Sequence, residues 1–121
     1  KSGGYLIIEQ TEALSVIDVN SGKNVTKAKS MEAIEASALK TNLEAADKLC
    51  QQIKIRNLSG IIIVDFINMN QRNCDILMEH LKSLAKKDIV STTIVDITKL
   101  GLVEITRKKI GKSLSESLNK A

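Results

Sequence analysis

The 121-residue sequence has no proline and no tryptophan, and it contains one tyrosine (Tyr5), one phenylalanine (Phe66) and one histidine. Because aromatic residues make up only 2% of the chain, the core must be aliphatic and few rings remain for stacking interactions. The two cysteines, Cys50 and Cys74, form no CxxC pair, which predicts free thiols rather than a zinc site or a disulfide framework. No apolar run approaches the roughly 18 residues of a membrane span, so we expect a soluble, cytoplasmic protein.

The composition that is present fits one folded domain. Hydrophobic residues make up 43% of the chain and charged residues 26%, close to the averages for globular proteins. The net charge of +4 permits contact with nucleic acid without requiring it. The chain begins with Lys1 rather than methionine, so we expect residues 1–121 to be a single subdomain cut from a longer polypeptide.

Hydrophobic patterning predicts an α/β domain, a mixed sheet with helices packed on it, in the order β-β-α-β-α-β. Residues 5–9 and 13–19 are predicted to form an antiparallel hairpin. The continuous β-branched run at 61–67 is typical of a central strand covered on both faces, and the weak alternation at 92–98 indicates a further strand.

The helical period appears twice. Apolar residues recur at steps of three or four between 32 and 56, and again between 71 and 86, where Asn70 is a suitable N-cap. Turn-forming and basic residues predict a loop at 20–30, while the state of 102–110 is left open between helix and strand.

Two aspartates do not fit a purely structural account. Asp18 and Asp65 each lie inside a hydrophobic strand, where an unpaired carboxylate is costly to bury, and both fall near the carboxyl end of that strand. Asn20 projects from the same face as Asp18 if the strand continues that far. If the two strands are neighbours, these side chains form an oxygen site suited to Mg²⁺; alternatively, each aspartate caps backbone N–H groups. Periodicity does not decide between these interpretations.

Other polar residues give weaker signals. His80 lies on the apolar stripe of the second helix, where a local partner is expected rather than a role as catalytic base. A basic cluster near the C-terminus could follow a phosphate backbone or form a solvated face; it consists of Arg107, Lys108, Lys109 and Lys112.

Five separated motifs carry a resemblance to a known family. They are Ser2-Gly3-Gly4, Thr11-Glu12-Ala13-Leu14 leading into Ile17-Asp18-Val19-Asn20-Ser21, Thr41-Asn42-Leu43-Glu44-Ala45-Ala46-Asp47, Gly60 with Val64-Asp65-Phe66-Ile67, and Gly101-Leu102-Val103-Glu104-Ile105-Thr106-Arg107. In these motifs the sequence resembles the catalytic region of the ribonuclease E/G family of bacterial endoribonucleases, in the subdomain likened to deoxyribonuclease I.

The resemblance implies a role for each candidate residue. Asp18 and Asp65 would hold the catalytic Mg²⁺, with Mn²⁺ as a substitute, and Asn20 would support them by hydrogen bonding. The implied reaction is hydrolysis of single-stranded RNA to 5′-phosphate and 3′-hydroxyl ends, in RNA processing and decay. Lys99 and Arg107 are candidate RNA contacts. The resemblance also implies a homo-oligomeric parent enzyme whose zinc link lies outside this chain.

The chain departs from the family pattern at two positions. Asn68 stands where the family commonly has a second aspartate after Asp65-Phe66-Ile67, and Lys99 stands where it commonly has arginine, which unlike lysine contacts phosphate bidentately. A hypothesis of another class therefore remains, in which the domain is a non-catalytic RNA-binding or oligomerisation scaffold.

Overall fold

The computed structural model describes residues 4–21 and 30–109. Over these residues the chain forms, in order, β1 (Tyr5–Gln10), β2 (Leu14–Asn20), α1 (Met31–Arg56), β3 (Gly60–Asp65), α2 (Gln71–Lys86), β4 (Thr92–Ile97) and β5 (Val103–Arg107). The predicted α/β class and the order of the first six elements are confirmed. The segment left open, 102–110, contains a strand, β5. Most of the predicted loop, at 22–29, and Lys112 lie outside the described residues.

The strands form one mixed sheet in the order β1-β2-β3-β5-β4. β2 and β3 are parallel, β1 is antiparallel to β2, and β5 is antiparallel to both β3 and β4. β2, β3 and β4 therefore run in one direction, and their carboxyl ends lie at the same edge of the sheet.

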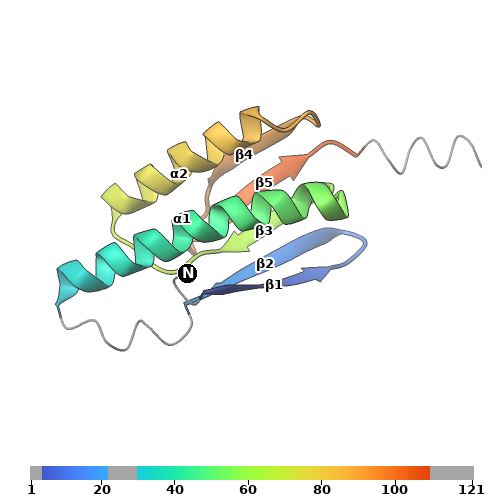
Figure 1. The fold of residues 1–121 in the computed structure, drawn as a ribbon. Coiled ribbons are helices and arrows are strands. Elements are labelled where there is room, and N and C mark those ends of the chain that lie inside the picture. The colour runs from blue at the N-terminus through green and yellow to red at the C-terminus, as the bar shows by residue number, and fades with distance from the viewer. Residues whose placement is uncertain (1–3, 22–29, 110–121) are drawn as a thin grey trace, which may run out of the picture.

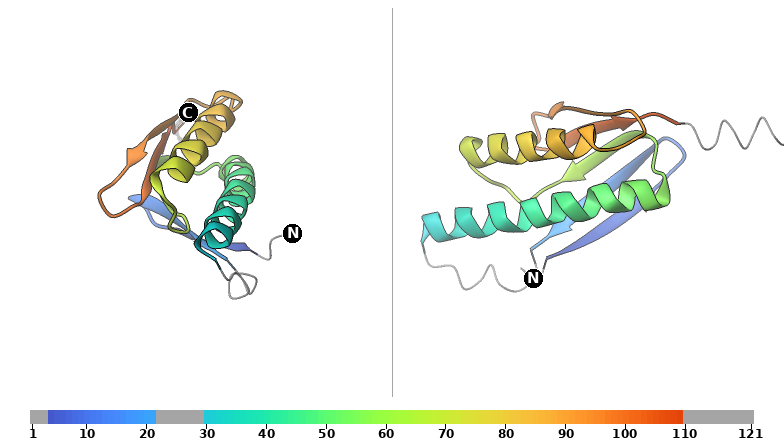
Figure 2. Two further views of the ribbon diagram at one scale, coloured as in Figure 1. Left: turned by 90° about the vertical axis from the view of Figure 1, so that its left-hand side faces the viewer. Right: turned by 45° about the horizontal axis from the view of Figure 1, so that its top comes forward.

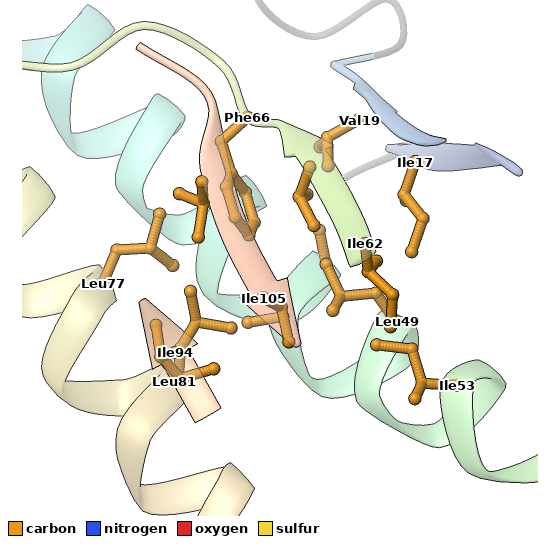
Figure 3. Close-up of a cluster of buried hydrophobic side chains, with 14 of the residues drawn as sticks. Ile17, Val19, Leu49, Ile53, Ile62, Phe66, Leu77, Leu81, Ile94 and Ile105 are labelled. Carbon is orange, nitrogen blue, oxygen red and sulfur yellow. The ribbon is translucent and has the colours of Figure 1, made fainter. Parts of the chain in front are cut away.

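Both helices pack on one face of the sheet, as Figure 1 and the two views of Figure 2 show. The core fills the space between the sheet and the helices and is almost entirely aliphatic, with Phe66 as its single ring (Figure 3). The buried strand residues alternate with residues on the opposite face, which neither described helix covers and which we call the open face. None of the described helices is both long and apolar enough to cross a membrane.

The prediction that the 61–67 strand is covered on both faces was wrong. Ile62 and Val64 are fully buried against the helices, whereas Ile61 on the open face is 42% exposed. A continuous apolar run has no period, so it does not reveal which face is covered.

Local sequence sets the helix ends, and the N-cap predicted at Asn70 is confirmed. The side chain of Asn70 accepts a hydrogen bond from the Asn73 N–H at 2.9 Å and begins α2. α1 ends at Arg56, and its C-cap is Asn57, which adopts the left-handed conformation that asparagine tolerates. The predicted local partner of His80 is Asp47 on α1, whose Oδ1 lies 2.8 Å from the His80 Nε2, and this contact links the two helices.

Candidate metal and RNA site

The strand register brings Asp18 and Asp65 side by side. They are paired residues of the parallel strands β2 and β3, and both lie at or near the carboxyl ends. Since Ile17 and Val64 point into the core, the alternation of each strand directs the two carboxylates to the open face. Asp18 is half-buried there and Asp65 is exposed.

Among the described residues, neither carboxylate has a hydrogen-bond or ion-pair partner. In the described part of the chain, Asp18 and Asp65 accept no side-chain or backbone hydrogen bond outside the strand ladder and form no ion pair. The alternative interpretation, in which each aspartate caps backbone N–H groups, therefore finds no support in this geometry. The two carboxylates lie next to each other, and no residue in 4–21 or 30–109 compensates their charge.

Asn20 lies on the open face two residues beyond Asp18. Its Nδ2 is buried and has no hydrogen-bond partner among the described residues. A buried amide N–H without an acceptor is costly, so such groups usually mark a site that a further polar molecule completes.

The donors at this edge suit a hard cation that brings its own water. Within residues 4–21 and 30–109, no three Asp, Glu, His or Cys side chains are grouped closely enough to form a complete metal site. Mg²⁺ needs only one or two carboxylates, because water and substrate phosphate fill its remaining positions. The pair of Asp18 and Asp65 fits that requirement.

Glu104 is an acidic neighbour that the sequence analysis missed. On β5 it is paired with Ile63 of β3 on one side and with Asp96 of β4 on the other. Ile63 precedes Asp65 by two residues, so Glu104 lies on the open face diagonally across from Asp65. The signal was the alternation of β5, in which Val103 and Ile105 are buried and Glu104 is not. Glu104 adds negative charge to the face that carries the aspartates.

Lys99 lies at the same edge of the sheet as the two aspartates. It is exposed in the turn between β4 and β5, where Gly101 has a positive φ of 84° and the Thr98 hydroxyl accepts a hydrogen bond from the Leu102 N–H. This position leaves the ammonium group accessible to a ligand at the carboxyl edge.

Arg107 does not lie on an accessible surface. Its side chain is 3% exposed, and its Nε is 2.8 Å from the Asp88 carboxylate. Its Nη1 donates to the Asn57 side chain and to the Leu58 carbonyl. The guanidinium is at the opposite end of β5, where its hydrogen bonds link the segments that follow α1 and α2 to the sheet. We therefore assign Arg107 a structural role, and the expectation that it contacts RNA is not retained.

The contact with Arg107 lowers the pKa of the Asp88 carboxyl. Burial acts to raise its pKa, but hydrogen bonds from Arg107, the Val90 N–H and Thr92, together with the charge of Arg107, outweigh burial and hold the pKa at about 2. The pair is an ionised link in the interior.

Comparison with known proteins matches the whole described region to one protein family. The model of the Ribonuclease E/G family matches residues 1–110. The chain is 47% identical to "Ribonuclease E" of Synechocystis sp. over 116 residues, which are 95% of this chain and 17% of that protein. It is 46% identical to a "Ribonuclease E/G-like protein" of Porphyra purpurea, covering 94% of this chain and 22% of the relative. It is 41% identical to "Ribonuclease G" of Escherichia coli K12, covering 98% and 24%. The chain thus spans about a fifth of the length of these relatives, and it belongs to the Ribonuclease E/G family.

Proposed function

We propose that this chain is the metal-binding catalytic subdomain of an Mg²⁺-dependent endoribonuclease that hydrolyses single-stranded RNA in RNA processing and decay. One observation carries the proposal: Asp18 and Asp65 lie side by side at the carboxyl edge of the sheet, on its open face, and have no side-chain partner in the part of the chain that the structure describes. Membership of the Ribonuclease E/G family supports it. Since the chain spans only 16–24% of its relatives, the proposal concerns a longer enzyme to which this chain contributes the cation site.

Asp18 and Asp65 would hold the cation. Their carboxylate oxygens are hard ligands, suited to Mg²⁺ or Mn²⁺. When bound, the cation would supply charge neutralisation at the scissile phosphate. The open face leaves room for an extended RNA strand to reach this edge, which a site enclosed between sheet and helices would not.

Asn20 would orient the reacting groups. Its unpaired Nδ2 can donate a hydrogen bond to a non-bridging phosphate oxygen or to the attacking water. Substrate binding would then satisfy a buried donor that has no acceptor among the described residues.

Water is the nucleophile that the side chains favour. Burial, only partly offset by the charge of Lys54, raises the pKa of the Cys50 thiol to about 11. Burial and the charges of Asp75 and Glu35 also raise the pKa of Cys74. Neither cysteine is therefore a thiolate at neutral pH. In the proposed step, the water oxygen bonds to phosphorus as the bond to O3′ breaks, and the proton released by the water ends on O3′. The products are a 5′-phosphate and a 3′-hydroxyl.

Lys99 is the RNA contact that we retain. An exposed lysine at the carboxyl edge would contact a phosphate of the bound strand. In the longer enzyme, Lys99→Ala should weaken RNA binding equally for all sequences and reduce the slope of log affinity against log salt by roughly 0.7, as expected for one phosphate contact to a single strand. Lys87→Ala, at the end of α2 away from this edge, is the control. Equal effects of the two substitutions would contradict this assignment.

A titration with Mn²⁺ tests the site directly. In ¹⁵N NMR spectra of the chain, the paramagnetic ion should broaden signals around the ends of β2 and β3 first. Asp18→Asn or Asp65→Asn should abolish the selective broadening, while Glu12→Gln, which removes an exposed charge in the β1–β2 turn, should preserve it. Cleavage of an end-labelled RNA by the longer enzyme, with mapping of the product ends, tests the chemistry. Absence of any response at these strand ends would favour the scaffold alternative.

A further inference from the structure

Asn42 is a buried polar residue that the proposed chemistry does not use. It lies in the middle of α1 and is fully buried. Both ends of its amide are bonded to one residue: its Nδ2 donates to the Ile67 carbonyl at 2.9 Å, and its Oδ1 accepts from the Ile67 N–H at 3.1 Å. A helix thus satisfies the backbone of the loop that follows β3, and it does so only two residues beyond Asp65.

Glu35 holds the other end of the same loop. It precedes Asn42 by seven residues, which is about two helical turns, so the two side chains leave α1 on the same side. The Glu35 Oε1 accepts from the Asn70 N–H at 3.0 Å and from the Asn73 side chain at 2.9 Å. Residues 66–70, which connect β3 to α2, are therefore fixed to α1 at both ends.

The sheet itself provides little restraint beyond Asp65. The pairing of β3 with β5 ends at Val64, and the pairing with β2 ends at Asp65 itself. The next backbone anchor along the chain is the Asn42 amide at Ile67. Two residues span at most about 7 Å, so a shift of Ile67 is transmitted directly to Asp65.

From this geometry we infer that Asn42 is a positioning residue for the cation site. Its amide fixes the backbone after β3 and so sets the direction of the Asp65 carboxylate relative to Asp18, while Glu35 secures the far end of the loop. This inference rests on the proposed function, because it assigns Asn42 a role in metal binding.

Asn42→Leu removes both hydrogen bonds at similar volume and is the direct test. The matched control is Leu49→Ala, which loses core packing on the same helix and contacts no residue of the 66–70 loop through a hydrogen bond. Without metal, ¹⁵N relaxation should show increased mobility of residues 65–70 in Asn42→Leu but not in Leu49→Ala. At a temperature where melting curves show both variants folded, Mn²⁺ affinity should fall roughly tenfold in Asn42→Leu only, as for loss of a residue that orients a ligand.

The second anchor gives a test that does not depend on a buried residue. Glu35→Ala should weaken Mn²⁺ binding, and Glu35→Gln, which keeps an acceptor oxygen, should restore most of the affinity. This pair decides the question if Asn42→Leu does not fold.

Three results would overturn the inference. If Asn42→Leu binds Mn²⁺ as tightly as the wild type does, the positioning role is refuted but the proposed function is not. The same holds for Glu35→Ala when the Glu35 variants are used instead. An equal loss in Leu49→Ala shows that the effect is general destabilisation. A wild-type chain that binds no Mn²⁺ refutes the proposed function, and the positioning role with it, even if the relaxation data confirm that Asn42 restrains the loop.

Discussion

The unpaired aspartates at the carboxyl edge predict that removing one of them stabilises the metal-free chain. Paired side chains on neighbouring strands lie roughly 5 Å apart at their Cβ atoms. Two unit charges at that separation repel by about 1 kcal/mol when the effective dielectric constant is close to that of water, and by about 2 kcal/mol when it is half as large. Because Asp65 is exposed and Asp18 only half-buried, we expect the lower value. For a chain of this length, that corresponds to a rise in Tm of about 3 °C.

Thermal melts in EDTA at low salt measure this effect. Asp18→Asn and Asp65→Asn should each raise the Tm, and the double variant should gain little more, because the first substitution already removes the repulsion. Concentrated salt should reduce the gain by screening. Added Mn²⁺ should stabilise the wild type but neither variant. Glu12→Gln is the control for a general change in net charge. A lower Tm in both single variants, or a gain no larger than that of Glu12→Gln, would refute a shared site.

Three further predictions follow from the interior and the surface. The low pKa of Asp88, about 2 against an ordinary 3.8, means that its pairing with Arg107 stabilises the fold fully above about pH 4 and that this contribution is lost as the pH falls toward 2. In urea unfolding, the stability gap between wild type and Asp88→Asn should therefore shrink by about 2 kcal/mol between pH 5 and pH 2, and a constant gap would contradict it. Iodoacetamide at pH 8 should modify Cys74 faster than Cys50, because burial raises the pKa of the Cys50 thiol to about 11. In denaturant the two modification rates should converge. Faster modification of Cys50 in the native chain would be inconsistent with its burial. The 121-residue chain alone should cut single-stranded RNA poorly, because Tyr5 is the only exposed aromatic ring in the described residues and stacking contributes roughly 1 to 3 kcal/mol per base. Efficient cleavage at low micromolar protein would show that stacking surfaces elsewhere in the enzyme matter less than we expect.

The elements that could be predicted from the sequence are those whose structure is indicated by residues within the same segment. The N-cap at Asn70 and the apolar stripe after it predicted α2 closely, because capping and helical period are local properties. The covered face of β3 could not be predicted, since its β-branched residues are the same on both sides. The state of β5 could not be predicted either, because a strand of five residues gives too few alternations to identify it.

The features that the sequence did not predict depend on contacts between distant segments. Arg107 was predicted from its charge to be a surface residue, but its partner Asp88 comes from the connection between α2 and β4, and no local pattern indicates that contact. In the same way, two aspartates near strand ends predict a shared site only if their strands are neighbours. That adjacency is a matter of topology, which the order of β2 and β3 in the sheet supplies.

The charge on the open face explains why a cation would be needed at all. The chain carries a net charge of +4, yet the edge proposed to bind RNA presents Asp18 and Asp65, with Glu104 of the neighbouring strand close to Asp65 on the same face. A phosphate that approaches this edge without a cation meets like charge, and the general positive charge of the chain is screened over roughly 10 Å at 0.1 M salt. A divalent cation held by Asp18 and Asp65 would neutralise their two negative charges and so remove most of this repulsion. In the proposed function, the carboxylates therefore make RNA binding at this edge conditional on the cation, and the two ligands must strengthen each other's binding by the same factor.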